Sequence, residues 1–358
     1  MGPAQEPARP DARRDTRLEA LRHWLANLAP RYDFDLESLA PASSDASFRR
    51  YFRVNAKAPA HGTAIIMDAP PDREDCAPFI RVAEYLAAGG VSVPRVESSA
   101  LDQGFLLLSD LGSTTYLAAL NPDNADRLYR DATAALIRIQ LLPDVTWLPR
   151  YDRARLRAEL ELFPQWYVGR HLGRTLEPAQ QQALHAVFDR LIERHQAELQ
   201  VTVHRDYHSR NLMVQDIAGR SGVAANPGVL DFQDAVRGPA SYDLVSLLRD
   251  AYIEWPEERV LDWAVRFWEK ARRAGVALPD DFGDFWIDFE YMGLQRHLKV
   301  LGIFARLHHR DGKDAYLKDL PLVRRYARSV AGRYKALAPL ARLLDQLEGT
   351  VVSARYTF

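Results

Sequence analysis

One short segment of the chain contains residues that could transfer a phosphoryl group. His204, Asp206, His208 and Asn211 form the pattern H-x-D-x-H-x-x-N between two apolar runs, and Asp231 follows a third. Phosphoryl transfer needs a carboxylate that orients the attacking hydroxyl and accepts its proton, and oxygen ligands for Mg²⁺. An Asp and an Asn this close on a tight loop can serve both ends of one phosphate. The second Asp, at the end of a returning strand, would complete a metal site.

A purely structural interpretation of the same residues exists. Asp and Asn in loops often serve as turn formers, and an isolated H-x-D triplet carries no information. Here the two acids, the amide, the preceding histidine and the apolar-D-F run at Val229–Phe232 occur together. Their combination favours a kinase site.

The elements that must position these residues fall into two groups. The first 110 residues predict a β-rich lobe with one or two helices. Helical spacing of leucines begins at Leu18, and a second helix ends at Gly89-Gly90. The predicted helices are 18–28 and 79–88, and the predicted strands are 48–54, 63–67, 91–96 and 105–108.

After Leu111 the periodicity becomes helical, except between Val201 and Val229, where short β-branched runs alternate with turns. The predicted helices are 126–141, 154–163, 179–198, 242–253, 256–274, 282–307 and 320–344. A small mixed lobe before a large helical lobe is an α+β, kinase-like layout.

Composition excludes several functional classes. The 358 residues carry 47 Lys and Arg against 48 Asp and Glu, so the formal net charge of −1 offers no field for nucleic acid. No apolar run approaches the roughly 18 residues of a membrane span. The single cysteine, Cys76, predicts a buried thiol and a reducing compartment. We therefore expect a cytoplasmic monomer that binds neither nucleic acid nor membrane.

The catalytic segment resembles the aminoglycoside phosphotransferase and choline kinase families. The resemblance implies a bilobal protein-kinase-like fold, with a nucleotide-binding lobe at 1–110 and a catalytic, acceptor-binding lobe at 111–358. It implies Asp206 as the base, Asn211 and Asp231 as Mg²⁺ ligands, and ATP as the phosphoryl donor. His204, His208 and Asp243 would support the site structurally, Asp243 close to a helix N-terminus, where negative charge is favoured.

The loop pattern also fits protein kinases, which have an Asn at the same spacing. However, no A-P-E follows Asp231 and no V-A-I-K occurs in the first lobe. Gln233 stands where a protein kinase has Gly. The sequence therefore disfavours a protein kinase.

Nucleotide-binding residues are expected in two places. By resemblance, Ser109 and Leu111 in the segment that joins the lobes would offer backbone groups to the purine. The small residues of Ala42–Ser47, including Ser44 and Ser47, would let backbone amides approach phosphate, and Arg49 would assist. An ordinary strand exit and a plain surface turn explain the same residues.

The strand lysine that normally pairs the phosphates is missing. Lys57 is the only lysine before residue 270 and falls in a turn, and Met67 or Asp68 takes the expected strand position. Three explanations remain open: an arginine substitutes, Lys57 reaches in, or Mg²⁺ carries more of the charge.

Acceptor residues are expected in the run Phe289–Leu307, where we select Glu290 and Arg296. Nearly the whole chain after Trp24 resembles the bacterial kinases that phosphorylate the anomeric (C1) hydroxyl of N-acetylmuramate and N-acetylglucosamine in peptidoglycan recycling. The lactyl carboxylate of N-acetylmuramate would account for Arg296 or another cation. The alternatives are a kinase of an aminoglycoside, choline or amino alcohol, and a nucleotide-binding pseudokinase that lacks the lysine.

Overall fold

The computed structural model describes residues 15–44, 48–56, 62–215 and 226–349. The chain divides into two compact units, Met1–Ile80 with Pro94–Asp110, and Arg81–Val93 with Leu111–Phe358. Residues 81–93, assigned to the first lobe from sequence, thus group with the second unit. Among the described residues no helix is long and apolar enough to cross a membrane.

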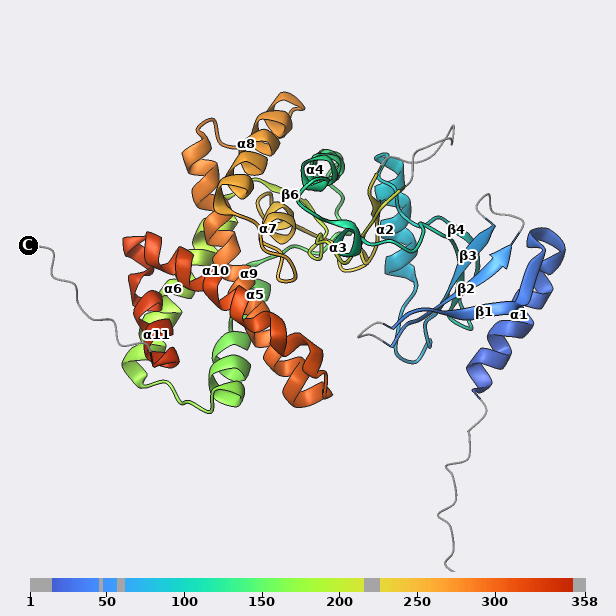
Figure 1. Cartoon of the computed structure of the whole chain (residues 1–358), viewed down its shortest axis with the longest axis horizontal. Coiled ribbons are helices and arrows are strands. Elements are labelled where there is room, and N and C mark those ends of the chain that lie inside the picture. Colours follow the sequence, from blue (N-terminus) through green and yellow to red (C-terminus); the bar gives the residue numbers. More distant parts are fainter. Residues whose placement is uncertain (1–14, 45–47, 57–61, 216–225, 350–358) are drawn as a thin grey trace, which may run out of the picture. The chain divides into compact units, whose positions relative to one another are not determined.

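The first unit contains a five-stranded antiparallel sheet in the order β1-β2-β3-β5-β4 (Figure 1). Its elements are α1 (Thr16–Tyr32), β1 (Phe34–Ser44), β2 (Arg50–Ala56), β3 (Thr63–Asp68), β4 (Val96–Ala100) and β5 (Phe105–Ser109). The apolar face of α1, with Leu21, Trp24 and Leu25, packs on alternate residues of β2 and β3. α2 (Ala77–Ala88) begins in this unit and continues in the second.

One strand of the first unit was missed from the sequence, and another was predicted at the wrong residues. β1 was not predicted, because its residues include Pro41 and three serines and lack a regular apolar alternation. Register shifts also interrupt its pairing with β2. The strand predicted at 91–96 instead lies at Val96–Ala100, and before it only Ser92 makes an isolated bridge. Cys76 is buried, as the composition suggested.

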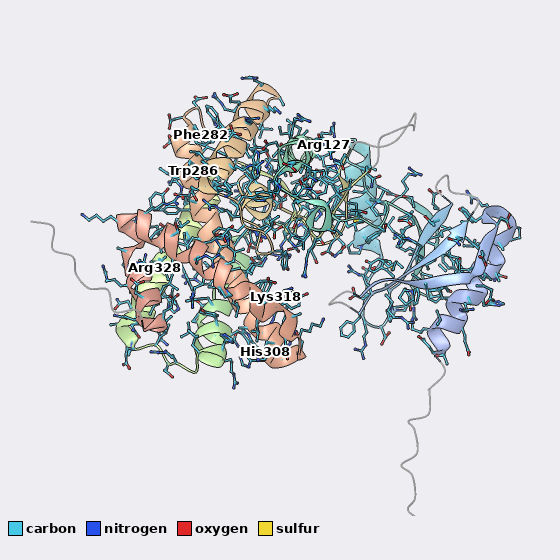
Figure 2. The ribbon with its side chains drawn as sticks, in the orientation of Figure 1. Arg127, Phe282, Trp286, His308, Lys318 and Arg328 are labelled. Atoms are coloured by element: carbon cyan, nitrogen blue, oxygen red, sulfur yellow. The ribbon has the colours of Figure 1, made fainter. Side chains whose placement is uncertain are left out.

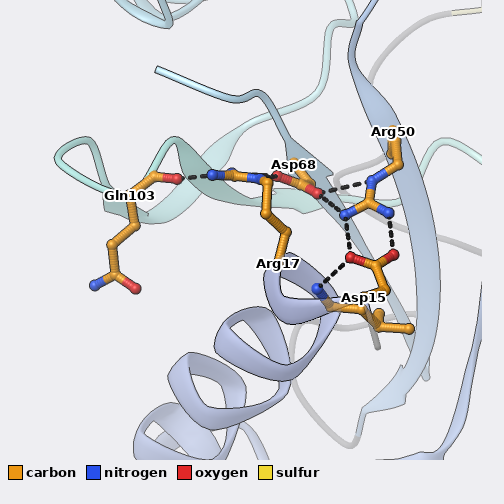
Figure 3. Close-up of polar contacts among 6 residues, drawn as sticks. Asp15, Arg17, Arg50, Asp68 and Gln103 are labelled. Atoms are coloured by element: carbon orange, nitrogen blue, oxygen red, sulfur yellow. Dashed lines mark hydrogen bonds and ion pairs between the residues drawn. The ribbon is translucent and has the colours of Figure 1, made fainter. Parts of the chain in front are cut away.

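Asp68 lies on the face of β3 that packs against α1, because Ala64, Ile66 and Asp68 alternate onto one side of the strand. Figure 3 shows its carboxylate between two guanidinium groups, with Nε of Arg17 at 2.9 Å and Nε of Arg50 at 2.8 Å. Arg50 also pairs with Asp15. Met67 and Asp68 were the two candidates for the position of the missing lysine. The carboxylate of Asp68 is bound to Arg17 of α1, and Met67 points to the opposite face of the sheet.

The second unit is mainly helical. Its first elements are α3 (Tyr116–Ala119), α4 (Ala125–Gln140), α5 (Arg153–Leu160), the π-helical segment η1 (Phe163–His171) and α6 (Pro178–Ala197). Four short strands follow, β6 (Gln200–Val203), β7 (Leu212–Met213), β8 (Gly228–Val229) and β9 (Val236–Pro239). The remaining helices are α7 (Tyr242–Leu248), α8 (Glu257–Arg273), α9 (Phe282–Asp311), η2 (Asp314–Asp319), α10 (Leu320–Arg333), η3 (Lys335–Leu337) and α11 (Ala338–Glu348).

α9 is the central helix of this unit, with Phe282 and Trp286 near its start and His308 near its end (Figure 2). Residues 289–299 are all buried, as in a helix covered on every side. Gly302 allows α9 to pack closely against the backbone at Leu162, because a Cβ at position 302 would lie 2.4 Å from the backbone carbon of Leu162. The polar residues of this stretch must therefore find partners inside the protein.

The single helix predicted at 320–344 is wrong. The structure has α10 and α11 separated by Tyr334, whose φ of −110° and ψ of 123° are extended. Pro339 lies in the first turn of α11, where it needs no backbone donor, but it could not continue a preceding helix. The helix predicted at 154–163 likewise ends at Leu160 and is followed by η1.

Candidate active site

Two small antiparallel pairs of strands bring the catalytic segment and Asp231 together. β6 pairs with β9, and β7 pairs with β8, so that the loop after β6 returns beside the end of β8. The backbone N–H of Leu230 donates to the carbonyl oxygen of Asn211 at 2.9 Å. The residues predicted from sequence spacing therefore meet through the pairing of strands only two to four residues long.

Asn211 joins the two acids of the site. Its Nδ2 donates to the backbone carbonyl of Asp206 at 3.0 Å and to the carboxylate of Asp231 at 3.2 Å. Gln233 donates from Nε2 to the other carboxylate oxygen of Asp231 at 2.8 Å. Asp206, Asn211 and Asp231 are each partly exposed, whereas the side-chain oxygen of Gln233 is buried.

The backbone at the site is held in an uncommon conformation. Arg205 has a φ of 79° and Asp231 a φ of 62°, in the left-handed region that non-glycine residues rarely adopt. Such strain persists only where surrounding contacts enforce it, and it is concentrated at functional sites. At Arg205 the enforcing contact is Asp243, whose carboxylate accepts the N–H groups of His204 at 2.7 Å and Arg205 at 3.0 Å.

His204 connects the two halves of the site. Its Nδ1 accepts the N–H of Asp206 at 3.2 Å, and its Nε2 donates to the carbonyl of Leu230 at 3.0 Å. Burial lowers the pKa of His204 to about 4, so that the ring is neutral at pH 7. The neutral tautomer with its proton on Nε2 satisfies both hydrogen bonds.

Further contacts fix the loop beyond Asp206. The hydroxyl of Tyr207 donates to the carbonyl of Ala132 at 2.9 Å, and the backbone N–H of Ser209 donates to Asp250 at 2.9 Å. The ring of His208 packs edge-on against Tyr252, with centroids 5.4 Å apart. These contacts anchor the loop that carries Asp206 and Asn211.

Asp206 has a strongly cationic environment. Burial would raise the pKa of its carboxyl group, but Lys299, His208, Arg296 and Arg205 together lower it below the usual value. The carboxylate is therefore ionised at neutral pH and can accept a proton. Two of these groups, Arg296 and Lys299, belong to α9. Their proximity to Asp206 could not be predicted from the sequence of the loop.

Glu159 of α5 lies at the centre of a buried group of polar side chains that the sequence analysis did not predict. Its carboxylate accepts from Arg205 at 2.5 Å, from Lys299 at 3.1 Å, and from the hydroxyl of Tyr151. Burial would raise the pKa of Glu159, but Lys299 and Arg205 lower it. Lys299 also donates to the hydroxyl of Tyr242 at 3.0 Å. No spacing signal marked Glu159, because its cationic partners Arg205 and Lys299 are far from it in the chain.

Two further residues predicted to belong to the site have partners of their own. Glu290 is bonded to Arg333 and Tyr334, of α10 and the turn after it, and is 2% exposed. Arg49 pairs with Glu74 at 2.9 Å. Glu290 is thus occupied within the second unit and does not join the residues around Asp206. Ser44 ends β1, whereas Ser47 and Lys57 lie outside the described residues.

The proposed purine-binding segment has its own backbone partners. The N–H of Ser109 donates to the carbonyl of Arg95 at 2.9 Å, and its hydroxyl accepts the N–H of Arg95 at 2.8 Å. In the second unit, the carbonyl of Leu111 accepts from Gln215 at 2.6 Å. Purine binding by Ser109 and Leu111 would therefore have to use backbone groups of this segment other than the N–H of Ser109 and the carbonyl of Leu111.

Metal binding at this site would need oxygens from a ligand. Among the described residues no three His, Cys, Asp or Glu side chains are grouped to hold an ion. Asn211 and Asp231 supply an amide and a carboxylate oxygen, and the Nδ2 of Asn211 is already used in two hydrogen bonds, which leaves its Oδ1. This hard, incomplete donor set suits Mg²⁺ completed by phosphate and water.

Comparison with known proteins identifies relatives over almost the entire chain. The model of the phosphotransferase enzyme family matches residues 38–277. The N-acetylmuramate/N-acetylglucosamine kinase of Pseudomonas aeruginosa is 47% identical over 340 residues, 93% of this chain and 97% of that protein. The proteins of the same name from Pseudomonas putida (49% over 311 residues, 87% and 88%) and Neisseria meningitidis serogroup B (45% over 334, 92% and 95%) are similarly close.

Solved structures show the same fold at low identity. The GDP complex of aminoglycoside 2'-phosphotransferase-IIIa has a TM-score of 0.58 at 14% identity, over 87% of this chain and 99% of that one. Choline kinase LicA from Streptococcus pneumoniae has a TM-score of 0.56 at 9% identity, also over 87% and 99%. The bilobal α+β fold and the family resemblance expected from sequence are both confirmed.

Proposed function

The chain belongs to the phosphotransferase enzyme family, and we propose that it transfers the γ-phosphate of ATP to the anomeric hydroxyl of N-acetylmuramate and N-acetylglucosamine. The observation that carries this proposal is the convergence of Asp206, Asn211 and Asp231 in a chain that matches kinases of these two sugars along nearly its full length. The product would be a sugar 1-phosphate, made in the cytoplasm during peptidoglycan recycling.

Asp206 is the proposed catalytic base. Its pKa is lowered by the surrounding cations, so the carboxylate is ionised and can accept a hydrogen bond from the acceptor hydroxyl. An anomeric hydroxyl is more acidic than an ordinary alcohol, so orientation of the nucleophile would contribute more than proton abstraction. His204 and Asp243 position Asp206 through the loop backbone and do not touch the substrate.

Asn211 and Asp231 are the proposed Mg²⁺ ligands. Magnesium held there would neutralise charge on the nucleotide's phosphates. The hydrogen bonds from Asn211 and Gln233 hold the Asp231 carboxylate in place before any ligand binds, so little reorganisation would be needed. Such preorganisation also disfavours a pseudokinase, which would not need to maintain a strained Asp231.

The test is a panel of acceptors with ATP and MgCl₂, with ADP release as the readout. We expect turnover of both N-acetyl sugars, and phosphorus–proton coupling at C1 in the NMR spectrum of the product. Turnover only of choline or aminoglycosides would replace the sugar assignment with the alternative kinase function. Nucleotide binding without turnover of any acceptor would indicate a pseudokinase.

A further inference from the structure

Arg296 of α9 is a buried cation that forms no ion pair among the residues that the structure describes. The residue is 7% exposed, and its Nε has no hydrogen-bond partner. Buried charges in proteins are normally paired, because the desolvation of an unpaired ion is strongly unfavourable. A buried arginine without an ion-pair partner is therefore suited to bind an anionic ligand.

Arg205 and Lys299, the other two permanent cations near Asp206, are already neutralised. Glu159 binds Arg205 at 2.5 Å and Lys299 at 3.1 Å, and the hydroxyl of Tyr242 takes a further hydrogen bond from Lys299 at 3.0 Å. Of these cations, Arg296 is thus the one whose charge remains available for a ligand.

The position of Arg296 places that charge beside the catalytic loop. Its guanidinium carbon lies 4.9 Å from the ring centroid of Tyr242, and Lys299 lies 5.7 Å from the same centroid. Asp243, which follows Tyr242 in the chain, accepts hydrogen bonds from the backbone of His204 and Arg205, the two residues before Asp206. Arg296 is also among the charges that lower the pKa of Asp206, which agrees with this proximity.

We propose that Arg296 binds the lactyl carboxylate of N-acetylmuramate and so favours this acidic acceptor over neutral N-acetylglucosamine. The inference rests on the proposed function. The two sugars differ by a lactyl ether at C3, and a planar guanidinium can bind its carboxylate through two parallel hydrogen bonds. The aromatic face of Tyr242 holds the guanidinium in place without consuming its donors.

The experiment compares the wild-type enzyme with Arg296→Gln on both sugars. For N-acetylmuramate we expect kcat/KM to fall roughly ten- to a hundred-fold, mainly through KM, because a charged hydrogen bond is lost. For N-acetylglucosamine, which has no carboxylate, kcat/KM should fall clearly less than for N-acetylmuramate, because this sugar loses only the influence of Arg296 on Asp206. The KM for ATP should be unchanged.

Two controls isolate the charge. The methyl ester of N-acetylmuramate keeps the size of the substituent without its charge, so the wild type should discriminate against it and Arg296→Gln should not. Arg306→Gln alters another arginine of α9 whose Nε lacks a partner, roughly 15 Å further along the helix at 1.5 Å per residue. Arg306→Gln should leave the preference between the two sugars unchanged.

An equal loss on both sugars, or a raised KM for ATP, would overturn the proposal. The first result would indicate a general role at the site, and the second would indicate a contact with the nucleotide. Absence of wild-type turnover on either sugar would instead refute the proposed function. Thermal melting of each variant separates misfolding from these outcomes, and Arg296→Lys, which keeps the charge, should recover part of the preference.

Discussion

The side-chain amide of Asn211 donates a hydrogen bond to the carboxylate of Asp231, with 3.2 Å between Nδ2 and Oδ2. Asn211 directly precedes β7 and Asp231 follows β8, and the same amide nitrogen also binds the backbone of Asp206. Asn211, one proposed metal ligand, therefore connects the backbone of the proposed base to Asp231, the other proposed ligand. Four predictions test this arrangement and the fold that maintains it.

Asp206→Asn should lower kcat by roughly a hundred-fold or more, because the amide can neither accept the proton nor attract the hydroxyl as a carboxylate does. The affinity for ATP should remain near that of the wild type. Steady-state kinetics and nucleotide titration measure both quantities. Asp262→Asn, on the exposed side of α8, is the matched control and should have no effect. Wild-type turnover by Asp206→Asn would remove Asp206 from the base role.

Asp231→Asn should raise the Mg²⁺ concentration needed for half-maximal activity by at least about ten-fold, because a neutral amide binds the ion more weakly. Asparagine is the informative replacement, since it tolerates the φ of 62° better than alanine would. The measurement is a magnesium titration at saturating ATP. A titration curve that coincides with the wild type would exclude Asp231 as a ligand.

His297 should make the enzyme less stable in acid. Burial lowers its pKa to about 3, whereas the unfolded residue titrates near 6.5. Between these values the unfolded chain binds more protons than the folded protein, so the stabilising contribution is complete above about pH 6.5 and declines as the pH falls. The maximum slope is about 1.4 kcal/mol per pH unit for one proton.

His297→Gln tests this linkage, because glutamine can still donate to the carbonyl of Arg249 but does not titrate. Urea unfolding between pH 7 and pH 4 should give a flatter pH profile for the variant than for the wild type. Asp243 and Asp288, whose pKa values are raised to about 7 and about 6, contribute with the opposite sign in both proteins. Identical slopes would show that His297 is not held neutral.

Gly302→Ala should destabilise the second unit by about 1–3 kcal/mol, because the added methyl group would collide with the backbone at Leu162. The free energy of unfolding is measured in urea. Gly293→Ala, on the same helix, is the control. Its Cβ would lie 3.7 Å from Val245, an ordinary contact, so the variant should be neutral or slightly more stable. Equal stability of both variants would contradict the close approach of α9.

The acceptor side of the site could not be predicted fully from sequence. Arg296 and Lys299 looked like polar neighbours on one helix, and only folding shows that Lys299 is paired with Glu159 and that Arg296 is not. Glu290 was selected from the same helix, but it faces α10 and pairs with Arg333. Adjacent turns of a buried helix face different neighbours, and sequence spacing does not say which.

The sequence by itself determined the two-lobe layout, the family, and the Asp206, Asn211 and Asp231 set, because these depend on local patterns: apolar periodicity, turns and fixed spacing within a loop. Only the tertiary structure decided which charges are satisfied. The partners of Asp68, Glu159 and Arg205 come from segments far apart in the chain. Long-range pairing follows from the packing of whole elements, and single residue types do not encode it.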